Sequence, residues 1–287
     1  MLAIYKKELR GYFTSIMGYI VNLVLIAIIG FYFMGGNLLG GSSVFGYTLA
    51  NASFVLIVVI PLLTMRTLSE EQKQKTDQML LSAPIKISSI VVGKFLAVAT
   101  VFTIPMLICC TMPLVLASYG KVVLEAAYAA VLAFWLFGLA LIAIGMVISS
   151  ITDNQIIAAV LGVGVSILIF LMHSLSASLS TTSMTSLIGI TVIIVIIAVL
   201  LYLFVRNIVI AAVPAVIGEI ALVVVYVVKP ALLEGTLSTV LSSISFYSRF
   251  TDFVYGALDL TSILYYVSFI GFFLYLTVQI IEKRRWN

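Results

Sequence analysis

Charge, histidine and cysteine are scarce in this sequence. Only 9% of its 287 residues are charged, whereas 63% are hydrophobic. A soluble domain cannot cover its surface with so few charges, because the exposed apolar area would drive aggregation. One histidine and two adjacent cysteines, Cys109 and Cys110, supply no normal set of zinc ligands. The sequence therefore excludes a soluble domain, and we expect neither a metal site nor catalytic residues.

Apolar runs of about 20 residues recur along the chain and match the thickness of the bilayer hydrocarbon. We predict an all-α polytopic membrane protein with about eight transmembrane helices in one domain, residues 1–287. Two prolines should bend the third span, and the sixth and seventh spans should form a tight hairpin, residues 187–228. A six-span alternative leaves that hairpin out of the membrane. The predicted spans are Ile16–Met34, Thr48–Met65, Ile87–Ala117, Ala126–Ile148, Ile156–Met172, Leu187–Val205, Ile208–Val228 and Ile263–Ile281.

Basic residues are distributed unevenly among the predicted loops. With the N-terminus inside, 12 of the 15 Lys and Arg residues fall on the inner side, as the positive-inside rule requires of cytoplasmic loops. Only Lys121, Lys229 and Arg249 fall outside. The asymmetry predicts a plasma-membrane protein with both termini in the cytoplasm. It also explains the net charge of +4 without a nucleic-acid partner.

The first fifteen residues combine aromatic and basic side chains at helical spacing. Such a pattern is typical of an amphipathic helix that lies in the headgroup layer of a membrane. The alternative is a frayed basic terminus. The residues that we expect to contact membrane lipid in this interfacial helix, residues 1–15, are Tyr5, Lys6, Lys7, Leu9 and Arg10.

A polar stretch between the second and third spans, Met65–Lys94, carries eight charges in an otherwise apolar chain. Within it we predict a helix over Ser69–Leu81 that begins with a capping box. In this arrangement the Ser69 side chain caps the helix, and the side chain of Gln72, three residues later, bonds back to the Ser69 amide. Acidic residues in its first turn suit the helix dipole. Apolar residues near its end are of the type that seats a helix in a partner's groove. The alternative is a solvated loop whose lysines only set the topology.

Two further regions stand out. Glu219 lies inside the predicted seventh span, where an ionisable residue should face protein or water. It is either a substrate or proton site or a hydrogen-bonded link between helices. Residues 229–262 form an outer segment, in which we predict one or two short helices in the outer leaflet, with Asp259 capping the last span. The apolar stripe in that segment is Leu237, Leu241, Ile244, Tyr247, Phe250, Val254 and Ala257.

Four pieces of the sequence resemble the permeases of ABC-2-type transporters, in particular the branch of the gliding-motility and nitrous-oxide-cluster permeases. The resemblance covers the chain except Leu187–Val228, which the common six-span pattern lacks. Lys75 also departs from the pattern, which has a glycine before the threonine. The four pieces are Lys6–Ser15; Arg66–Ile85 with Gly93–Phe95; Ser149–Ala159; and Phe246–Phe269 with Val278–Trp286.

This resemblance implies a permease subunit of an exporter that dimerises with a second copy or a related permease. The subunit would be driven by two copies of a cytoplasmic ABC ATPase, through a coupling helix in the cytoplasmic loop, residues 66–86. The family leaves room for an extracytoplasmic auxiliary subunit, and the membrane would be that of a bacterium or archaeon. The residues that we expect to couple to the ATPase are Glu70, Glu71, Lys75, Thr76, Asp77, Met79, Leu80 and Leu81.

The chain has no phosphate-binding loop of the form GxxxxGK[ST]. We therefore expect no cofactor on this chain, with ATP and Mg²⁺ bound by the partner ATPase. The alternative function is a stand-alone secondary transporter or channel, which would place more ionisable groups at the midplane than Glu219. An intramembrane enzyme would need a nucleophile with a base, or a metal.

Overall fold

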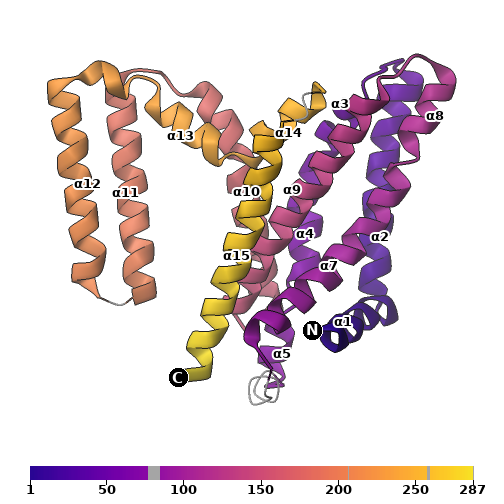
Figure 1. The fold of residues 1–287 in the computed structure, drawn as a ribbon, viewed down its shortest axis with the longest axis horizontal. Helices are drawn as coiled ribbons and strands as arrows, with labels where there is room; N and C mark the ends of the chain where they lie inside the picture. Colours follow the sequence, from indigo (N-terminus) through magenta and orange to yellow (C-terminus); the bar gives the residue numbers. More distant parts are fainter. Residues whose placement is uncertain (77–84, 206, 257–258, 287) are drawn as a thin grey trace. The chain divides into compact units, whose positions relative to one another are not determined.

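The computed structural model describes residues 1–76, 85–205, 207–256 and 259–286 (Figure 1). Every regular element in this described part is a helix, so the predicted all-α fold is confirmed. The chain divides into two compact units. Unit 1 comprises Met1–Phe170 and Phe246–Asn287, and unit 2 comprises Leu171–Ser245. The assignment of one permease domain to the whole chain stays a prediction.

Seven helical segments among the described residues are long and apolar enough to cross a membrane. The described apolar part of the sixth predicted span is a shorter helix, Ser183–Val199, so the count of eight stays a prediction. The seven segments are Ile16–Leu39, Phe45–Lys73, Ile87–Tyr119, Leu124–Ile151, Gln155–Ser178, Ile208–Val228 and Leu260–Arg285.

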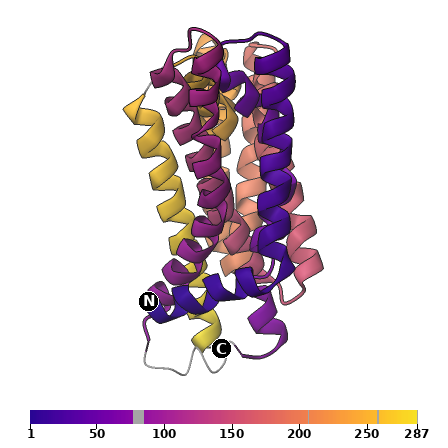
Figure 2. The same cartoon turned by 90° about the vertical axis from the view of Figure 1, so that its right-hand side faces the viewer.

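Unit 1 begins with a helix that lies across the others and continues through two interrupted spans. α1 runs nearly perpendicular to α2 at one end of the unit (Figure 2). The first span ends in a π-helical turn, and the second contains a single 3-10 turn. The elements are α1 (Leu2–Thr14), α2 (Ile16–Tyr32), η1 (Phe33–Leu39), α3 (Phe45–Ala52), η2 (Ser53–Val55), α4 (Leu56–Thr64) and α5 (Ser69–Lys73).

The third span is interrupted at the second of the two prolines expected to bend it, Pro113, whereas Pro105 lies inside a continuous helix. α7 (Ile87–Cys109) ends before α8 (Met112–Tyr119) begins. Pro113 has no N–H group to donate to the carbonyl of Cys109 four residues earlier, so the helix cannot continue regularly through this point. The break is therefore dictated by the sequence.

The core of unit 1 is built around α9 (Leu124–Ile151), which contacts α4, α7, α14 and α15. Small residues let these neighbours approach closely. A Cβ atom at Gly138 would collide with the ring of Phe102, and one at Gly145 would lie 2.8 Å from Thr64 Cβ. The unit also holds α14 (Phe246–Val254) and α15 (Leu260–Trp286), while α10 (Gln155–Ser178) runs from unit 1 into unit 2.

The outer segment contains short helices, as predicted, but its apolar stripe is interrupted. Ser245 is extended, with ψ at 112°, and separates α13 (Thr236–Ile244) from α14. α13 belongs to unit 2, whereas Phe250 of α14 is fully buried in the core of unit 1. Asp259 caps α15, because its Oδ1 accepts from the Thr261 amide at 3.0 Å; this bond lowers the pKa of Asp259. Ala257 lies outside the described residues.

Unit 2 contains the predicted hairpin, formed by α11 (Ser183–Val205) and α12 (Ile208–Val228), followed by η3 (Pro230–Leu233) and α13. Asn207 caps α12 by accepting from Val209 N at 3.0 Å. α13 packs on α11, where Leu237 fills the space that a side chain on Gly189 would occupy.

Candidate functional site

The N-terminal helix α1 is fixed to α7 at the end of unit 1 where α5 lies (Figures 1 and 2). Tyr5 Oη lies 3.1 Å from Thr100 Oγ1 of α7. A Cβ atom on Gly93 would lie 3.2 Å from the Met1 carbonyl, so glycine permits the close approach of the two helices. The side chains of Lys6, Lys7 and Arg10 are exposed. An anchored helix with an exposed basic face fits the predicted interfacial role, which stays a prediction.

The predicted coupling residues are only partly described. Glu70 and Glu71 lie in the first turn of α5, and Thr76 donates from Oγ1 to the Glu71 carbonyl at 3.4 Å. α5 ends at Lys73, eight residues before the predicted end of the helix. The remaining residues expected to bind the partner, namely Asp77, Met79, Leu80 and Leu81, lie outside the described residues.

Lys75 adopts a left-handed backbone conformation, with φ at 56°. Among the described residues it is the one non-glycine residue with positive φ. Glycine adopts this conformation without strain, whereas other residues lose about 1–2 kcal/mol. The resemblance predicts a glycine at this position, and the backbone conformation here is one that glycine favours.

The predicted capping box of α5 is wrong. Leu68 occupies the N-cap position, and no side chain of the helix caps it. Ser69 Oγ instead donates to the Met65 carbonyl, and Gln72 Nε2 donates to the Ser150 carbonyl at 3.1 Å. Ser69 is thus used by the preceding turn and Gln72 by a contact with α9, so neither side chain forms the local cap.

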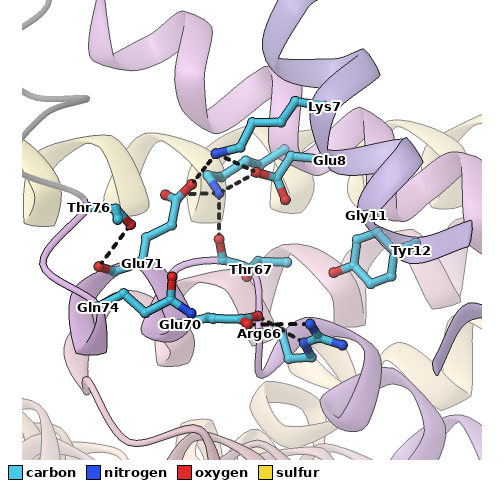
Figure 3. A pocket seen from close by; sticks show the side chains of 11 residues that line it. Lys7, Glu8, Gly11, Tyr12, Arg66, Thr67, Glu70, Glu71, Gln74 and Thr76 are labelled. Atoms are coloured by element: carbon cyan, nitrogen blue, oxygen red, sulfur yellow. Dashed lines mark hydrogen bonds and ion pairs between the residues drawn. The ribbon is translucent and has the colours of Figure 1, made fainter. Parts of the chain in front are cut away.

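A buried ammonium group joins α1, α5 and α7 (Figure 3). Lys94 of α7 is 1% exposed, and its Nζ lies 2.9 Å from Glu8 Oε1 and 3.0 Å from Glu71 Oε2. The same Nζ donates to the Thr67 carbonyl at 2.7 Å. An ammonium group has three N–H donors, so these three acceptors satisfy it completely. We call Lys94, Glu8, Glu71 and Thr67 the lysine junction.

The charges around the lysine junction are balanced. Lys7 of α1 lies 3.2 Å from Glu71 Oε1, so two carboxylates, Glu8 and Glu71, face two ammonium groups. A buried ion pair is tolerated only when its geometry is good and every group is bonded. The junction meets this condition and connects the polar stretch to two other helices.

A cavity of about 390 Å³ opens beside the junction (Figure 3). Arg66 Nε contacts Glu70 Oε2 at 2.9 Å on one wall. Tyr12 is buried on another wall, its hydroxyl donating to the Leu63 carbonyl at 2.9 Å, and burial raises the pKa of Tyr12. The cavity is lined by Lys7, Glu8, Gly11, Tyr12, Arg66, Thr67, Glu70, Glu71, Gln74, Thr76 and Lys94.

Glu219 has a partner within the hairpin of unit 2. Thr191 Oγ1 of α11 donates to Glu219 Oε2 of α12 at 3.1 Å. The bond joins the two helices of the hairpin, which is the structural alternative proposed for this residue. No group of three or more His, Cys, Asp or Glu residues that could hold a metal is found in the described part of the chain.

Two residues of the lysine junction were missed as functional candidates from the sequence. The sequence presents Glu8 only as part of the N-terminal amphipathic helix, and Lys94 only as one of the charges of the polar stretch and as part of the resembling piece Gly93–Phe95. One signal was available: Lys94 lies inside a long apolar helix, Ile87–Cys109, where a charge must find a partner. The identity of the partners was not available, because Glu8 precedes Lys94 by 86 residues.

A comparison with protein families gives a match over most of unit 1. Residues 2–188 match the model of a family described as "ABC-2 family transporter protein". The match includes α1, the polar stretch, α7 and α9, and it ends within α11. A comparison with curated proteins found no match.

Proposed function

The chain belongs to the ABC-2 transporter family, and from this premise we propose that a separate cytoplasmic ATPase drives it through the polar stretch that contains α5. The chain is then the membrane component of the transporter, while ATP and Mg²⁺ bind to the partner. The lysine junction is the observation that carries the proposal. It attaches α5 to α1 and α7 through a 3.0 Å ion pair and a buried lysine.

The physical argument concerns rigidity. Hydrolysis in water can move helices in lipid only if a stiff element connects the two. Exposed ion pairs contribute little stiffness, but Lys94 is buried and bonded to three acceptors on two other elements. A push on α5 would therefore displace α1 and α7 as well. Rigid-body shifts of this kind are a known way of transmitting a switch.

We further propose an outward direction of transport, as export or as extraction from the outer leaflet, with peptides, lipids and envelope polymers as substrate classes. Two permease copies with two ATPase copies would form the complete transporter, and an auxiliary subunit outside the membrane is compatible with it. These proposals rest on membership of the family. The mass of the purified complex and ATP-dependent uptake into inverted vesicles would test them.

The proposed orientation has both termini in the cytoplasm. Within unit 1, α5, the lysine junction and the basic end of α15 lie at one end, where Arg284 Nη2 donates to the Ile151 carbonyl at 3.3 Å. Basic residues gathered at one end support a cytoplasmic location for that end. Single cysteines at Lys6 and Lys283 should resist a membrane-impermeant thiol reagent in whole cells, whereas one at Lys121 should react.

Co-purification with the ATPase tests the central proposal. Leu80→Asp should weaken association of the full-length chain with the ATPase by about tenfold or more, as expected for a central contact residue. Glu71→Ala should also weaken it, because it removes an acceptor of Lys94 and loosens the lysine junction that holds α5. Glu125→Ala is the matched control, because Glu125 is an exposed carboxylate at the start of α9, away from α5. Transport that proceeds without any ATPase would contradict the proposal and favour a stand-alone transporter.

A further inference from the structure

The short helix α5 has no N-terminal cap of its own. A helix leaves its first amide groups without internal partners, and side-chain oxygens usually accept from them. Leu68, at the N-cap position of α5, has no such oxygen. The acceptor comes from another helix, which the sequence places 80 residues away.

Ser149, near the end of α9, is this acceptor. Its Oγ lies 3.1 Å from both Leu68 N and Ser69 N, and it donates to the Met65 carbonyl at 3.2 Å. A hydroxyl group has one donor and two acceptor sites, so all three are used on the turn before α5. Ser149 is fully buried, and water therefore cannot replace these bonds.

The packing of α9 makes this contact possible. Gly145 lies one helical turn before Ser149 and permits the close approach of Thr64 at the end of α4. The short serine side chain then reaches the main chain that follows. The carbonyl of the next residue, Ser150, accepts a further bond from Gln72 Nε2 of α5. The end of α9 thus holds residues 65–72 by three main-chain groups (Met65 O, Leu68 N and Ser69 N) and by the side chain of Gln72.

We propose that Ser149 is the positioning residue of the coupling segment: it caps α5 from α9 and delivers the movement of α5 to the core helix of unit 1. This inference rests on the proposed function. α9 contacts α4, α7, α14 and α15, so a displacement received at its end reaches most of the unit. Without the cap, α5 would move against α9, and its displacement would reach α9 only indirectly, through the lysine junction and α7.

Hydrogen exchange on the full-length chain in detergent tests the positioning without any partner. Ser149→Ala should speed exchange of the Leu68 and Ser69 amides by about tenfold, the size expected for loss of a buried cap. Ser150→Ala is the matched control. Ser150 is also fully buried, but its hydroxyl donates only to Val147 of its own helix, and its carbonyl is unchanged by the substitution. Equal exchange in the two variants would overturn the proposal.

ATP hydrolysis by the complex with the partner ATPase then tests the consequence. Ser149→Ala should reduce the stimulation of hydrolysis by the permease severalfold, Ser150→Ala should not, and Ser149→Thr should restore much of it, because threonine keeps the hydroxyl group. If the alanine variant does not fold, Ser149→Cys replaces it in both measurements, since a thiol keeps the volume but bonds weakly.

The two failures are distinguishable. If the wild-type chain binds and stimulates no ATPase, the proposed function fails, while the exchange data still decide whether Ser149 holds α5. If the wild-type chain stimulates the ATPase and Ser149→Ala does so equally, the proposed function stands and the role of Ser149 is refuted.

Discussion

α9 in unit 1 and α12 in unit 2 are equally apolar, yet their surroundings differ completely. Within the most apolar 18-residue stretch of each helix, 83% of the residues of α9 are buried inside the protein, against 6% of the residues of α12. Alanine and glycine supply nine of the 28 residues of α9, whereas valine and isoleucine supply 12 of the 21 residues of α12. Small residues let helices pack closely in a membrane, where apolarity alone gives no preference for protein over lipid. Hydropathy therefore predicts which helices leave water, and residue size predicts which of them are packed against other helices.

We expect the largest loss of stability from a substitution in the lysine junction, because the closely packed unit 1 buries the charge of Lys94 there. Lys94→Met should cost about 3 kcal/mol, since it leaves Glu8 and Glu71 without their buried partner. Thermal unfolding of the purified protein would measure the loss. Lys7→Met is the control: that side chain is 64% exposed, and its pair with Glu71 should contribute less than about 1 kcal/mol. Similar losses of stability in Lys94→Met and Lys7→Met would show that the buried and the exposed charge contribute equally here.

Glycine substitutions test the packing itself. Gly145→Ala in α9 should destabilise the protein by about 1–3 kcal/mol, because the new methyl group would lie 2.8 Å from Thr64 Cβ. Gly218→Ala in α12 should change stability by less than about 0.5 kcal/mol, because its methyl group would meet only Ile194 Cδ1, at 3.5 Å. The midpoints of thermal unfolding in the same detergent compare the two. Equal shifts would mean that α12 is as tightly packed as α9.

Two residues in the left-handed conformation give a smaller effect, and their substitutions should change stability in opposite directions. Gly235 of unit 2 has φ at 70°, and Gly41 and Gly256 of unit 1 have similar positive values. Lys75 of unit 1, in contrast, has φ at 56° despite its side chain. Lys75→Gly should relieve strain and Gly235→Ala should introduce it, each by about 1 kcal/mol. Unfolding measurements should therefore move in opposite directions. A loss of stability in Lys75→Gly would show that the lysine side chain compensates for its backbone.

The hairpin of unit 2 should give the smallest effects. Thr191→Val should cost about 0.6 kcal/mol, the average for a hydrogen bond between membrane helices. Glu219→Gln should cost less, since an amide oxygen still accepts from Thr191 Oγ1. Unfolding and transport are measured on the same preparations. Unchanged transport in Glu219→Gln would rule out a role for the carboxylate in a substrate or proton path.

Much of the fold followed from the sequence because its determinants are local. Apolar runs predicted the membrane helices, Pro113 predicted the break after α7, and Asp259 was correctly expected to cap α15. The stripe through residues 237–257 followed helical spacing, but Ser245 divides it between two units. Periodicity could not show this division, because the residues on both sides of the break keep the same spacing.

The site was less predictable because its contacts are long-range. The polar stretch, α1 and their charges were identified, but Glu8, Glu71 and Lys94 come from three separate elements. Ser149 was part of a recognised motif, yet nothing local distinguishes it from Ser150 beside it. Only the packing of α4 on α9 decides which of the two serines faces α5.

The hydrogen bonds that hold the main chain of residues 65–69 have a consequence for how the sequences of such transporters diverge. Ser149 contacts the main chain of Met65, Leu68 and Ser69, and Lys94 also contacts the Thr67 carbonyl. Main-chain groups are the same in every non-proline residue. The outward side chains of this segment are therefore free to change during evolution without loss of their attachment. A permease could acquire a new ATPase by replacing a few side chains here, and exchange of this short segment between paralogues should transfer partner choice.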